Sequence, residues 1–415
     1  MRAVGCTVVA RNYLSYAQVA GDGWLRFHPG HPFAVLVIDD DEDRPASDAH
    51  CRFLSPRAIG ISPHELERLR GIYTVQELTC ALKPHLLRFL LGEGADAVVY
   101  VDSDTDILGS MDHVAELAAR SGVALSPNLL EPPPLDGRSP SELELAVVGM
   151  YCSGLIAVGS SATEFLNWWM SRSRWDCLFA EAAGMHADQR WLDWVHLYFD
   201  HAVIRDPALN VAHWNLHERR LAFTDGLFTV NGAPLRSFHF AGFDPLRPYR
   251  VTWYRWEAPF RVDLDDVALA RLCRQYADKL RGAGYEERRT LPYRYDRSVA
   301  GSRLGLWERR VYREALLAAE ARGDGRVPSP FDPSRAAEFE RLLTNPRSAG
   351  LLSEAALSRL ADGRVALNGG GWNRRRITEA VRGRFARGLR APRAPWMPDP
   401  RPGDRTRAGY GRVGR

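Results

Sequence analysis

The sequence predicts an α/β fold in which a mostly parallel sheet is flanked by helices and followed by a mainly helical C-terminal region. Three observations indicate this architecture. In the first half of the chain, apolar runs of strand length alternate with segments of helical periodicity, which is the pattern of consecutive βαβ units. The strand-like runs are apolar throughout, as expected of strands buried on both faces. From about residue 250 onward the periodicity is mostly helical.

The expected elements follow in order along the chain. Strands are predicted at 6–13, 33–40, 97–104 and 123–128. Helices are predicted at 15–29, 75–94, 112–122, 162–179 and 186–199. Residues 129–144 are rich in Pro and polar residues and predict a loop. The stretch VGMYCSGLIAVG, residues 148–159, predicts a strand, a turn and a second strand.

Composition excludes several classes of protein. With 45% hydrophobic residues the chain is not a disordered protein, and it contains no run of about 18 apolar residues that would predict a transmembrane helix. The short apolar run at the N-terminus lacks the length and the cleavage site of a secretory signal. The six cysteines are scattered without a CxxC pair, which is typical of reduced thiols. We therefore expect a cytoplasmic protein.

The predicted organisation has three parts: an α/β region at 1–250, a helical region at 251–390 and a basic, disordered tail at 391–415. Charge sets the C-terminal end apart. From Trp372 to Arg415 there are thirteen Arg and three acidic residues, so this segment carries about +10 and the remainder about −6 of the net +4. Two interpretations of the tail stay open: contact with an anionic membrane surface, or a solvated extension. Nucleic-acid binding is not expected, because no recognition motif accompanies the charge.

Polar residues follow several of the predicted strands at the point where each strand ends. Arg11, Asn12 and Tyr13 follow the first strand, Asp39 and Asp40 end the second, and the stretch from Asp102 to Asp104 ends the third. The carboxyl ends of parallel strands meet at one edge of a sheet, where ligands bind. These side chains should therefore share one rim.

The stretch VVYVDSDTDIL, residues 98–108, places Asp102, Asp104 and Asp106 at the mouth of a buried strand. Carboxylates this close repel one another unless a cation lies between them, which favours a metal site. A calcium loop of the EF-hand type is excluded, because its sixth and twelfth positions would be Ile107 and His113 instead of Gly and Glu.

Three interpretations of the acidic stretch remain. A phosphohydrolase of the haloacid dehalogenase type would use Asp102 as its nucleophile, but the Thr of that motif comes one residue early, at Thr105. The Asp-x-Asp of a nucleotide-sugar glycosyltransferase would hold Mn²⁺ or Mg²⁺ and so neutralise a departing diphosphate. Alternatively the acids cap the next helix or are solvated, and for Asp106 we expect this structural role.

Seven stretches together resemble the GT-A-fold glycosyltransferases related to family 8, and more closely a group of bacterial glycosyltransferases. The resemblance extends from about residue 4 to residue 250. It is carried by ARNYL (10–14), ELTCALKPHLLRFLL (77–91), VVYVDSDTDIL (98–108), YCSGLIAVG (151–159), HADQRWLD (186–193), NVAHWNLHER (210–219) and FHFAGFDP (238–245).

The resemblance implies roles for residues at these positions. Asp102, Asp104 and His239 would be the metal ligands. The nucleotide sugar would contact the following residues: Ala10, Arg11, Asn12, Tyr13, Asp39, Lys83, Ser103, Ser153, Gly154 and Gly242. Asp188 and Gln189 would lie beside the anomeric carbon as catalytic residues. Asn210, Trp214, Asn215 and His217 form a polar and aromatic loop suited to binding a sugar.

The chain departs from the family pattern at two positions. Ser153 stands where the family has Asn, and Asp244-Pro245 stands where the family has a Lys-Pro-Trp sequence that contacts phosphate. Lys83 or Arg88 could supply the missing cation, and we favour Lys83, which resembles the family's helix lysine. Trp168, Trp169, Trp191 and Trp194 are expected in the core, because they have helical spacing.

The function implied by the resemblance is transfer of a sugar from a nucleoside diphosphate sugar to an acceptor hydroxyl, with retention of configuration. The expected cofactor is Mn²⁺ or Mg²⁺, and a UDP-sugar is the favoured donor. The acceptor is a glycan, a lipid-linked molecule or a small molecule. The alternatives are a sugar-nucleotide-binding scaffold without turnover and the phosphohydrolase that uses Asp102.

Overall fold

A seven-stranded sheet organises the chain, which the computed structural model describes over residues 1–41, 51–254, 259–261, 266–323 and 327–345. The strands, in spatial order, are β10 (Ala202–Val203), β6 (Val123–Pro127), β7 (Tyr151–Gly159), β4 (Ala97–Val101), β1 (Ala3–Val9), β2 (Phe33–Val37) and β3 (Cys51–Leu54). All neighbours pair in parallel except β7, which is antiparallel to both β4 and β6. The predicted α/β fold with a mostly parallel sheet is confirmed.

The strand order reverses between β1 and β4. From β1 the chain adds β2 and then β3 on one side, whereas β4 lies on the other side of β1. Two parallel strands that lead away to opposite sides leave a crevice at their carboxyl ends, and ligands of α/β proteins bind there. The residues after β1 and β4 begin with Arg11 and Asp102, so the sheet itself brings two of the predicted polar stretches together.

Helices cover both faces of the sheet because alternate residues of each strand face opposite sides. The helices before residue 200 are α1 (Leu14–Phe27), α2 (Pro63–Ile72), α3 (Val75–Gly92), α4 (Asp112–Ser121), α5 (Glu142–Val148), α6 (Thr163–Ser173) and α7 (Val195–Tyr198). Val4, Cys6 and Val8 of β1 pack in one apolar cluster with α3 and α6. Ala3 and Val9 belong to a second cluster with α1 and α4, so the central strand is buried on both faces.

A small sheet beside the main one returns the chain to the carboxyl end of β4. It contains β11 (Val211–Ala212), β15 (Ser237–His239) and β5 (Thr105–Ile107), with β15 antiparallel to β5. The register pairs His239 with Thr105, and the backbone N–H of Phe240 donates to the carbonyl of Asp104 at 2.8 Å. Residues that are 134 positions apart, His239 and Thr105, thereby become neighbours at the mouth of β4.

The remaining short strands lie outside the two sheets that form the site. They are β8 (Phe179–Ala180), β9 (Met185–His186), β12 (Leu221–Thr224), β13 (Leu227–Val230) and β14 (Ala233–Pro234). Short 3₁₀ turns at Arg11–Tyr13 and Gln189–Trp194 carry predicted site residues.

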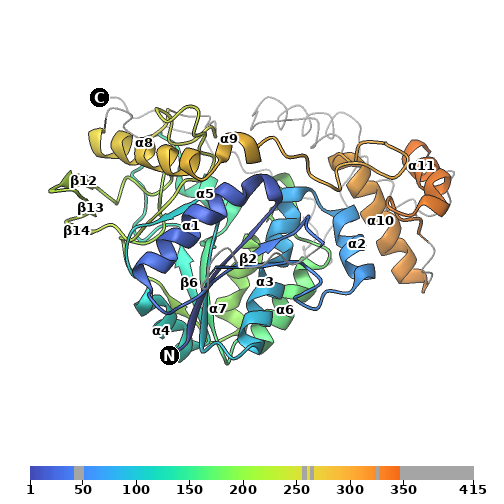
Figure 1. Cartoon of the computed structure of the whole chain (residues 1–415), viewed down its shortest axis with the longest axis horizontal. Helices are drawn as coiled ribbons and strands as arrows, with labels where there is room; N and C mark the ends of the chain where they lie inside the picture. Colours follow the sequence, from blue (N-terminus) through green and yellow to red (C-terminus); the bar gives the residue numbers. More distant parts are fainter. Residues whose placement is uncertain (42–50, 255–258, 262–265, 324–326, 346–415) are drawn as a thin grey trace, which may run out of the picture. The chain divides into compact units, whose positions relative to one another are not determined.

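The described part of the predicted helical region, residues 266–323 and 327–345, is partly helical. It contains α8 (Val267–Gly282), α9 (Tyr285–Arg288), α10 (Leu306–Arg322) and α11 (Ala336–Thr344). Helix α8 lies beside α1, and α10 lies beside α2 (Figure 1). The predicted tail at 391–415 lies outside the described residues, and the boundaries at 250 and 390 stay predictions.

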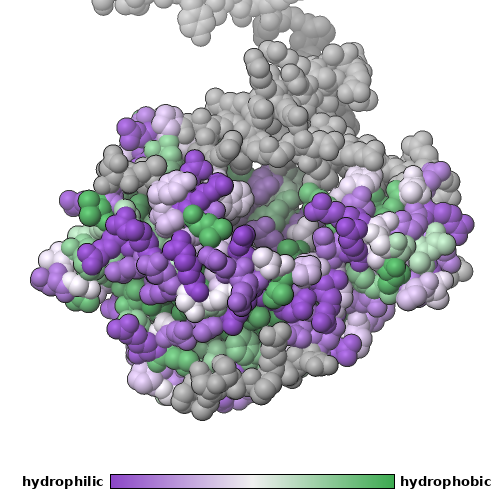
Figure 2. Space-filling view, turned by 45° about the horizontal axis from the view of Figure 1, so that its top comes forward, coloured by the Kyte–Doolittle hydropathy of each residue, from purple (hydrophilic) through white to green (hydrophobic). Residues whose placement is uncertain are grey.

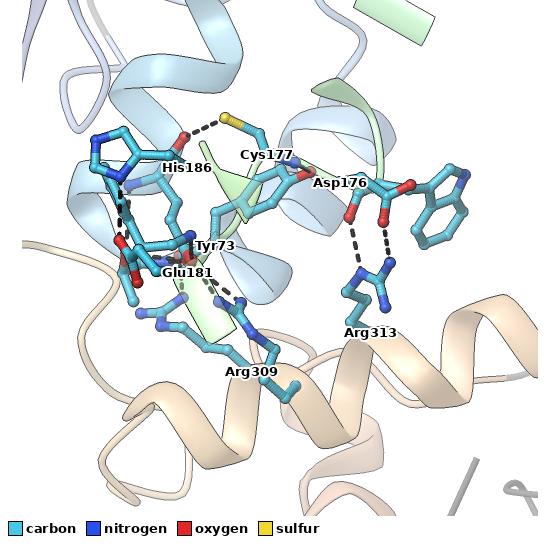
Figure 3. A network of polar contacts seen from close by, with 12 residues as sticks. Tyr73, Asp176, Cys177, Glu181, His186, Arg309 and Arg313 are labelled. Carbon is cyan, nitrogen blue, oxygen red and sulfur yellow. Dashed lines mark hydrogen bonds and ion pairs between the residues drawn. The ribbon is translucent and has the colours of Figure 1, made fainter. Parts of the chain in front are cut away.

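Arginines on α10 attach this helix to the α/β region through backbone carbonyls and a carboxylate (Figure 3). Arg309 donates to the carbonyls of Arg70 and Tyr73 at 2.5 and 2.6 Å. Arg313 donates to the carbonyl of Trp175 at 2.8 Å and pairs with Asp176. Guanidinium groups suit this task because they present several donors in a rigid plane.

Three structural expectations were wrong. Residues 151–159 form the single continuous strand β7, whose register against β6 shifts, since Leu125 pairs with Ile156 and the next residue, Ser126, pairs with Cys152. The predicted loop at 129–144 ends in the start of α5 at Glu142. Of the four tryptophans expected in the core, Trp194 is 46% exposed.

The described surface seen in Figure 2 is largely hydrophilic, with hydrophobic residues scattered among polar ones. None of the helices within the described residues combines the length and apolar character needed to cross a membrane.

Candidate active site

Two carboxylates and one imidazole converge at the carboxyl end of β4. One ligand atom each from Asp102, Asp104 and His239 lies within 4.8 Å of the others. His239 Nε2 is 3.2 Å from Asp104 Oδ1 and 3.8 Å from Asp102 Oδ2. Among the described residues this is the one cluster of His, Cys, Asp and Glu side chains with the spacing of a metal site.

Gly154 makes room for this cluster. Its backbone carbonyl accepts from the N–H of Asp102 at 2.8 Å, so β7 runs directly beneath the acidic turn. A Cβ atom at position 154 would lie 2.6 Å from His239 Cε1 and 2.7 Å from Asp102 Oδ2. Those distances are far inside van der Waals contact, so only glycine permits the strand to approach the three ligands this closely.

Lys83 lies under the site as a buried cation. Its ammonium group is 3.1 Å from Asp102 Oδ1 and 3.3 Å from Asp188 Oδ2, and it donates to the Ser153 carbonyl and hydroxyl at 3.2 and 3.1 Å. Burial alone would lower the pKa of Lys83, but the two carboxylates outweigh it and raise this pKa well above the usual value. Lys83 therefore stays charged.

Burial and the neighbouring charges also shift the pKa values of Asp102 and Asp188. Burial would raise the pKa of Asp102, but Lys83 and His239 outweigh it and hold this pKa below its usual value. For Asp188 burial wins over Lys83, and its pKa is raised. Asp102 is thus the better charged ligand, while Asp188 is 1% exposed and lies deeper.

Tyr100 contacts Asp102, although the sequence did not predict it as a site residue. Its hydroxyl donates to Asp102 Oδ1 at 2.8 Å, and its ring lies 4.8 Å from the Lys83 ammonium. In the sequence it is one apolar-looking position of a buried strand. A tyrosine in such a run nevertheless indicates a polar partner in the folded protein, because a buried phenolic O–H normally has one.

The residues after β1 form the second part of the rim. Asp39 is 1% exposed and accepts from the Arg11 backbone N–H at 2.8 Å, with the Arg11 guanidinium 3.4 Å away. Tyr13 stacks on Tyr16 at 4.8 Å and is 45% exposed. Asp39 therefore holds the turn, Ala10 is buried within it, and Tyr13 offers an accessible ring.

Asp188 and Gln189 contact β7, and Asp188 also pairs with Lys83. Asp188 Oδ1 accepts from the Ser153 hydroxyl at 3.2 Å. The Gln189 amide accepts from the Ser153 N–H at 3.0 Å and donates to the Val148 carbonyl at 3.0 Å. Both polar atoms of Gln189 are thus engaged by backbone groups.

Three residues of the predicted sugar-binding loop are buried, and the fourth, His217, is half-buried. Asn210 and Asn215 are 1% and 0% exposed, and their side chains are hydrogen-bonded within the protein. The Trp214 ring packs edge-to-face on His239 at 5.3 Å, and its Nε1 has no partner among the described residues. His217 is half-buried and lies 3.5 Å from the Glu131 carbonyl.

Three further predicted residues occupy different positions. Ser103 is half-exposed in the turn between the two acids. Gly242 has a φ of +70°, and a Cβ there would meet Thr252 Oγ1 at 2.7 Å, so it serves the turn after β15. The expectation that Asp106 faces solvent or caps a helix was wrong: it is 1% exposed and accepts from Lys279 of α8 at 2.7 and 2.8 Å.

The chain has distant similarity to known proteins. The profiles of known families give no match to this chain. The uncharacterized protein YfnD of Bacillus subtilis strain 168 is 22% identical over 206 residues, which make up 46% of this chain and 62% of YfnD. The chain thus matches less than two thirds of that relative.

Solved structures similar to the chain include two glycosyltransferases. The galactosyltransferase LgtC, in complex with donor and acceptor sugar analogues, is 16% identical with a TM-score of 0.41, and the match covers 68% of this chain and 96% of LgtC. The glycosyltransferase GlyE of Streptococcus pneumoniae TIGR4 is 11% identical with a TM-score of 0.38, and the match covers 71% and 66%. The proposed function of this chain therefore rests on the geometry of its site residues.

Proposed function

We propose that this protein is a metal-dependent glycosyltransferase that moves a sugar from a nucleoside diphosphate sugar, preferably a UDP-sugar, to an acceptor hydroxyl with retention of configuration. The observation that carries the proposal is the convergence of Asp102, Asp104 and His239 within 4.8 Å at the switch point of the sheet. An accessible tyrosine ring, Tyr13, lies on the same rim.

The donor set suits Mn²⁺, with Mg²⁺ as the alternative. Two carboxylate oxygens and one imidazole nitrogen are ligands that Mn²⁺ accepts, and Gly154 has no side chain that would displace them. Such a cation stabilises the negative charge of a leaving diphosphate. The raised pKa of His239, which Asp104 causes against the effect of burial, means that a proton competes with a cation for this site.

We assign the nucleoside to Arg11, Asn12 and Tyr13, with the base against the exposed face of Tyr13. Lys83 pairs with both Asp102 and Asp188 and helps to hold the pKa of Asp102 low, and its ammonium group supplies positive charge beneath the diphosphate. It is 2% exposed, so its effect on phosphate is electrostatic and not a direct clamp.

We assign the donor sugar to the space bounded by Ser153, Gly154 and Asp188. Asp188 is the residue proposed to accept a hydrogen bond from a sugar hydroxyl or to stabilise positive charge at the anomeric carbon. Gln189 acts at the same place by holding the Ser153 backbone. Trp214, whose buried Nε1 has no partner among the described residues, and the half-buried His217 are the residues proposed to contact the acceptor, which is a glycan, a lipid-linked molecule or a small molecule.

Release of nucleoside diphosphate from a panel of UDP-, GDP-, ADP- and dTDP-sugars tests the proposal. Wild type with Mn²⁺ should release one diphosphate slowly to water and faster with a suitable acceptor. Asp104→Asn should lose at least 100-fold in rate, a loss of order 3 kcal/mol in transition-state stabilisation. Asp278→Asn is the matched control, because Asp278 is an exposed surface acid.

Binding of a sugar nucleotide without any release would favour the scaffold function instead. Release of inorganic phosphate from a phosphomonoester, with a phosphorylated Asp102, would favour the phosphohydrolase. No binding and no turnover with any member of the panel would contradict the proposed function.

A further inference from the structure

Asn210 contacts the proposed metal ligand His239 from the side that faces away from the acids. Its Oδ1 is 3.3 Å from His239 Nδ1, and its side chain is buried with the residue 1% exposed. The thiol of Cys152 lies 3.8 Å from the same oxygen. The Asn210 side chain is therefore engaged within the protein beside His239, although the sequence suggested a sugar contact for it.

The structure turns the amide nitrogen of Asn210 toward Ser126 and its amide oxygen toward the imidazole. Asn210 Nδ2 donates to Ser126 Oγ at 3.1 Å. The amide nitrogen only donates and the amide oxygen only accepts, so the group facing His239 is an acceptor. A hydrogen bond at 3.3 Å then requires that His239 Nδ1 carries a proton and donates it.

This arrangement determines the direction of the free lone pair on His239. With Nδ1 as the donor, the other ring nitrogen, Nε2, faces Asp104 Oδ1 at 3.2 Å and is the atom available to a cation. Metal-bound histidines generally donate their second N–H to a carbonyl, a carboxylate or water, and this bond fixes the ring orientation and the tautomer.

The backbone of Asn210 is held as firmly as its side chain. Its N–H donates to Ser237 Oγ at 2.9 Å, and its carbonyl accepts from Arg219 at 3.0 Å and from Asn215 Nδ2 at 3.1 Å. Its φ is +50°, a left-handed conformation that Asn tolerates better than most residues. The surrounding polar groups thus hold the amide oxygen in one position against the imidazole.

We propose that Asn210 is a positioning residue for the metal site: its amide oxygen holds His239 in the Nδ1-protonated tautomer, so that Nε2 completes a site with Asp102 and Asp104. This inference rests on the proposed metal dependence, and it assigns Asn210 to the metal centre and not to the sugar. Removal of such an outer partner typically costs 10–100-fold in metal affinity.

Mn²⁺ binding to the full chain tests this proposal, measured by calorimetry and by the electron paramagnetic resonance signal of free Mn²⁺. Asn210→Gly removes the acceptor but tolerates the left-handed backbone, and its Mn²⁺ affinity should fall 10–100-fold. Asn210→Asp retains an acceptor oxygen and should keep the affinity within about threefold of wild type.

Asn231→Gly is the matched control. Asn231 has a φ of +51°, close to that of Asn210, and its side chain bonds only to backbone groups of Arg220 and Glu218. Its Mn²⁺ affinity should equal that of wild type. Thermal unfolding of each variant without metal separates a loss of fold from a loss of affinity.

The two proposals fail in different ways. If wild type binds no Mn²⁺, the proposed metal dependence is wrong and the role of Asn210 falls with it. If wild type binds Mn²⁺ and folded Asn210→Gly binds it equally well, the metal dependence stands and the positioning role is overturned. A loss in Asn210→Gly that Asn210→Asp recovers supports the proposal, whereas an equal loss in Asn231→Gly contradicts it.

Discussion

At the scale of single residues, the geometry of the site depends on a few closely packed atoms. Asp102 is shared between Lys83, Tyr100 and His239, so each neighbour constrains its two oxygens. Gly154 lies beneath them with no side chain. Small changes here should affect the site before they affect the fold, because the rest of the sheet is buried and well packed.

Gly154→Ala should therefore lower Mn²⁺ affinity at least tenfold. Its new methyl group would overlap His239 and Asp102, and relieving the overlap requires one ligand to move. Gly92→Ala is the control, because nothing lies within 4 Å of its Cβ, and in a helix it should leave stability unchanged or raise it by up to about 1 kcal/mol. Titration with Mn²⁺ and thermal unfolding of both variants measure the effects. Unaltered Mn²⁺ binding in Gly154→Ala would contradict the geometry of the site.

His213 should make stability depend on pH. It is 4% exposed, and burial, with a smaller effect of His239, lowers its pKa from 6.5 to about 3. Between these values the unfolded chain binds a proton that the folded chain excludes, so stability is lost as the pH falls below 6.5. The loss approaches about 1.4 kcal/mol per pH unit for this one group.

Urea unfolding of wild type and His213→Phe from pH 7.5 to pH 4.5 measures this dependence. The aromatic replacement keeps the ring contacts with Trp214 and Tyr254 but cannot titrate. The stability difference between the two proteins should shift in favour of the variant as the pH falls. Parallel pH profiles would show that His213 is protonated equally in both states.

At the scale of elements, helix α3 connects the site to the C-terminal helices. Glu77 forms a capping box with Thr74 at its start, accepts from the Phe179 N–H at 2.9 Å, and pairs with Arg310 of α10. Lys83 lies on the same helix. The Glu77 side chain is 1% exposed, so this ion pair is buried between three segments of the chain.

Glu77→Ala should destabilise the protein by roughly 3–5 kcal/mol, because it leaves Arg310 as a buried charge without its partner and removes a helix cap. Glu144→Ala is a matched control: it breaks a capping box of the same type on α5, where no buried arginine is paired, and should cost only about 1 kcal/mol. Chemical denaturation compares them. Equal losses would mean that the Arg310 pair contributes nothing beyond the cap.

The elements also show what can be read from sequence and what cannot. Apolar runs predicted β1, β2, β4 and β6 because burial on both faces leaves a local signature. Ser153 and Gly154 suggested a turn, yet they lie within β7, because a close approach of ligands and not a reversal requires a small residue there. The partners of Asp106 and Glu77 could not be predicted, since Lys279 and Arg310 are more than 170 residues away in the sequence.

At the scale of the whole molecule, the site is assembled from segments that are distant in sequence. The acids come from the end of β4, the imidazole from β15 and the buried lysine from α3. The sequence predicted the residues of the metal cluster through a family resemblance, because spacing alone does not connect His239 to Asp102. Sugar binding by Asn210 and Asn215 stays a prediction: both side chains are hydrogen-bonded within the protein, and polar residues in a loop have no sequence feature that distinguishes binding from internal hydrogen bonding.

The central claim is that Asp102, Asp104 and His239 hold a divalent cation which in turn binds a nucleoside diphosphate. The most direct test is thermal unfolding of wild type and Asp104→Asn with UDP, with Mn²⁺, with both, and with both plus excess chelator. A ligand that binds only the folded state stabilises it by mass action, by about 2.7 kcal/mol at a hundred times its dissociation constant. We predict a rise in melting temperature for wild type only when UDP and Mn²⁺ are present together, its loss on chelation, and no rise for Asp104→Asn. Equal stabilisation of both proteins, or stabilisation by UDP that does not depend on Mn²⁺, would contradict the claim.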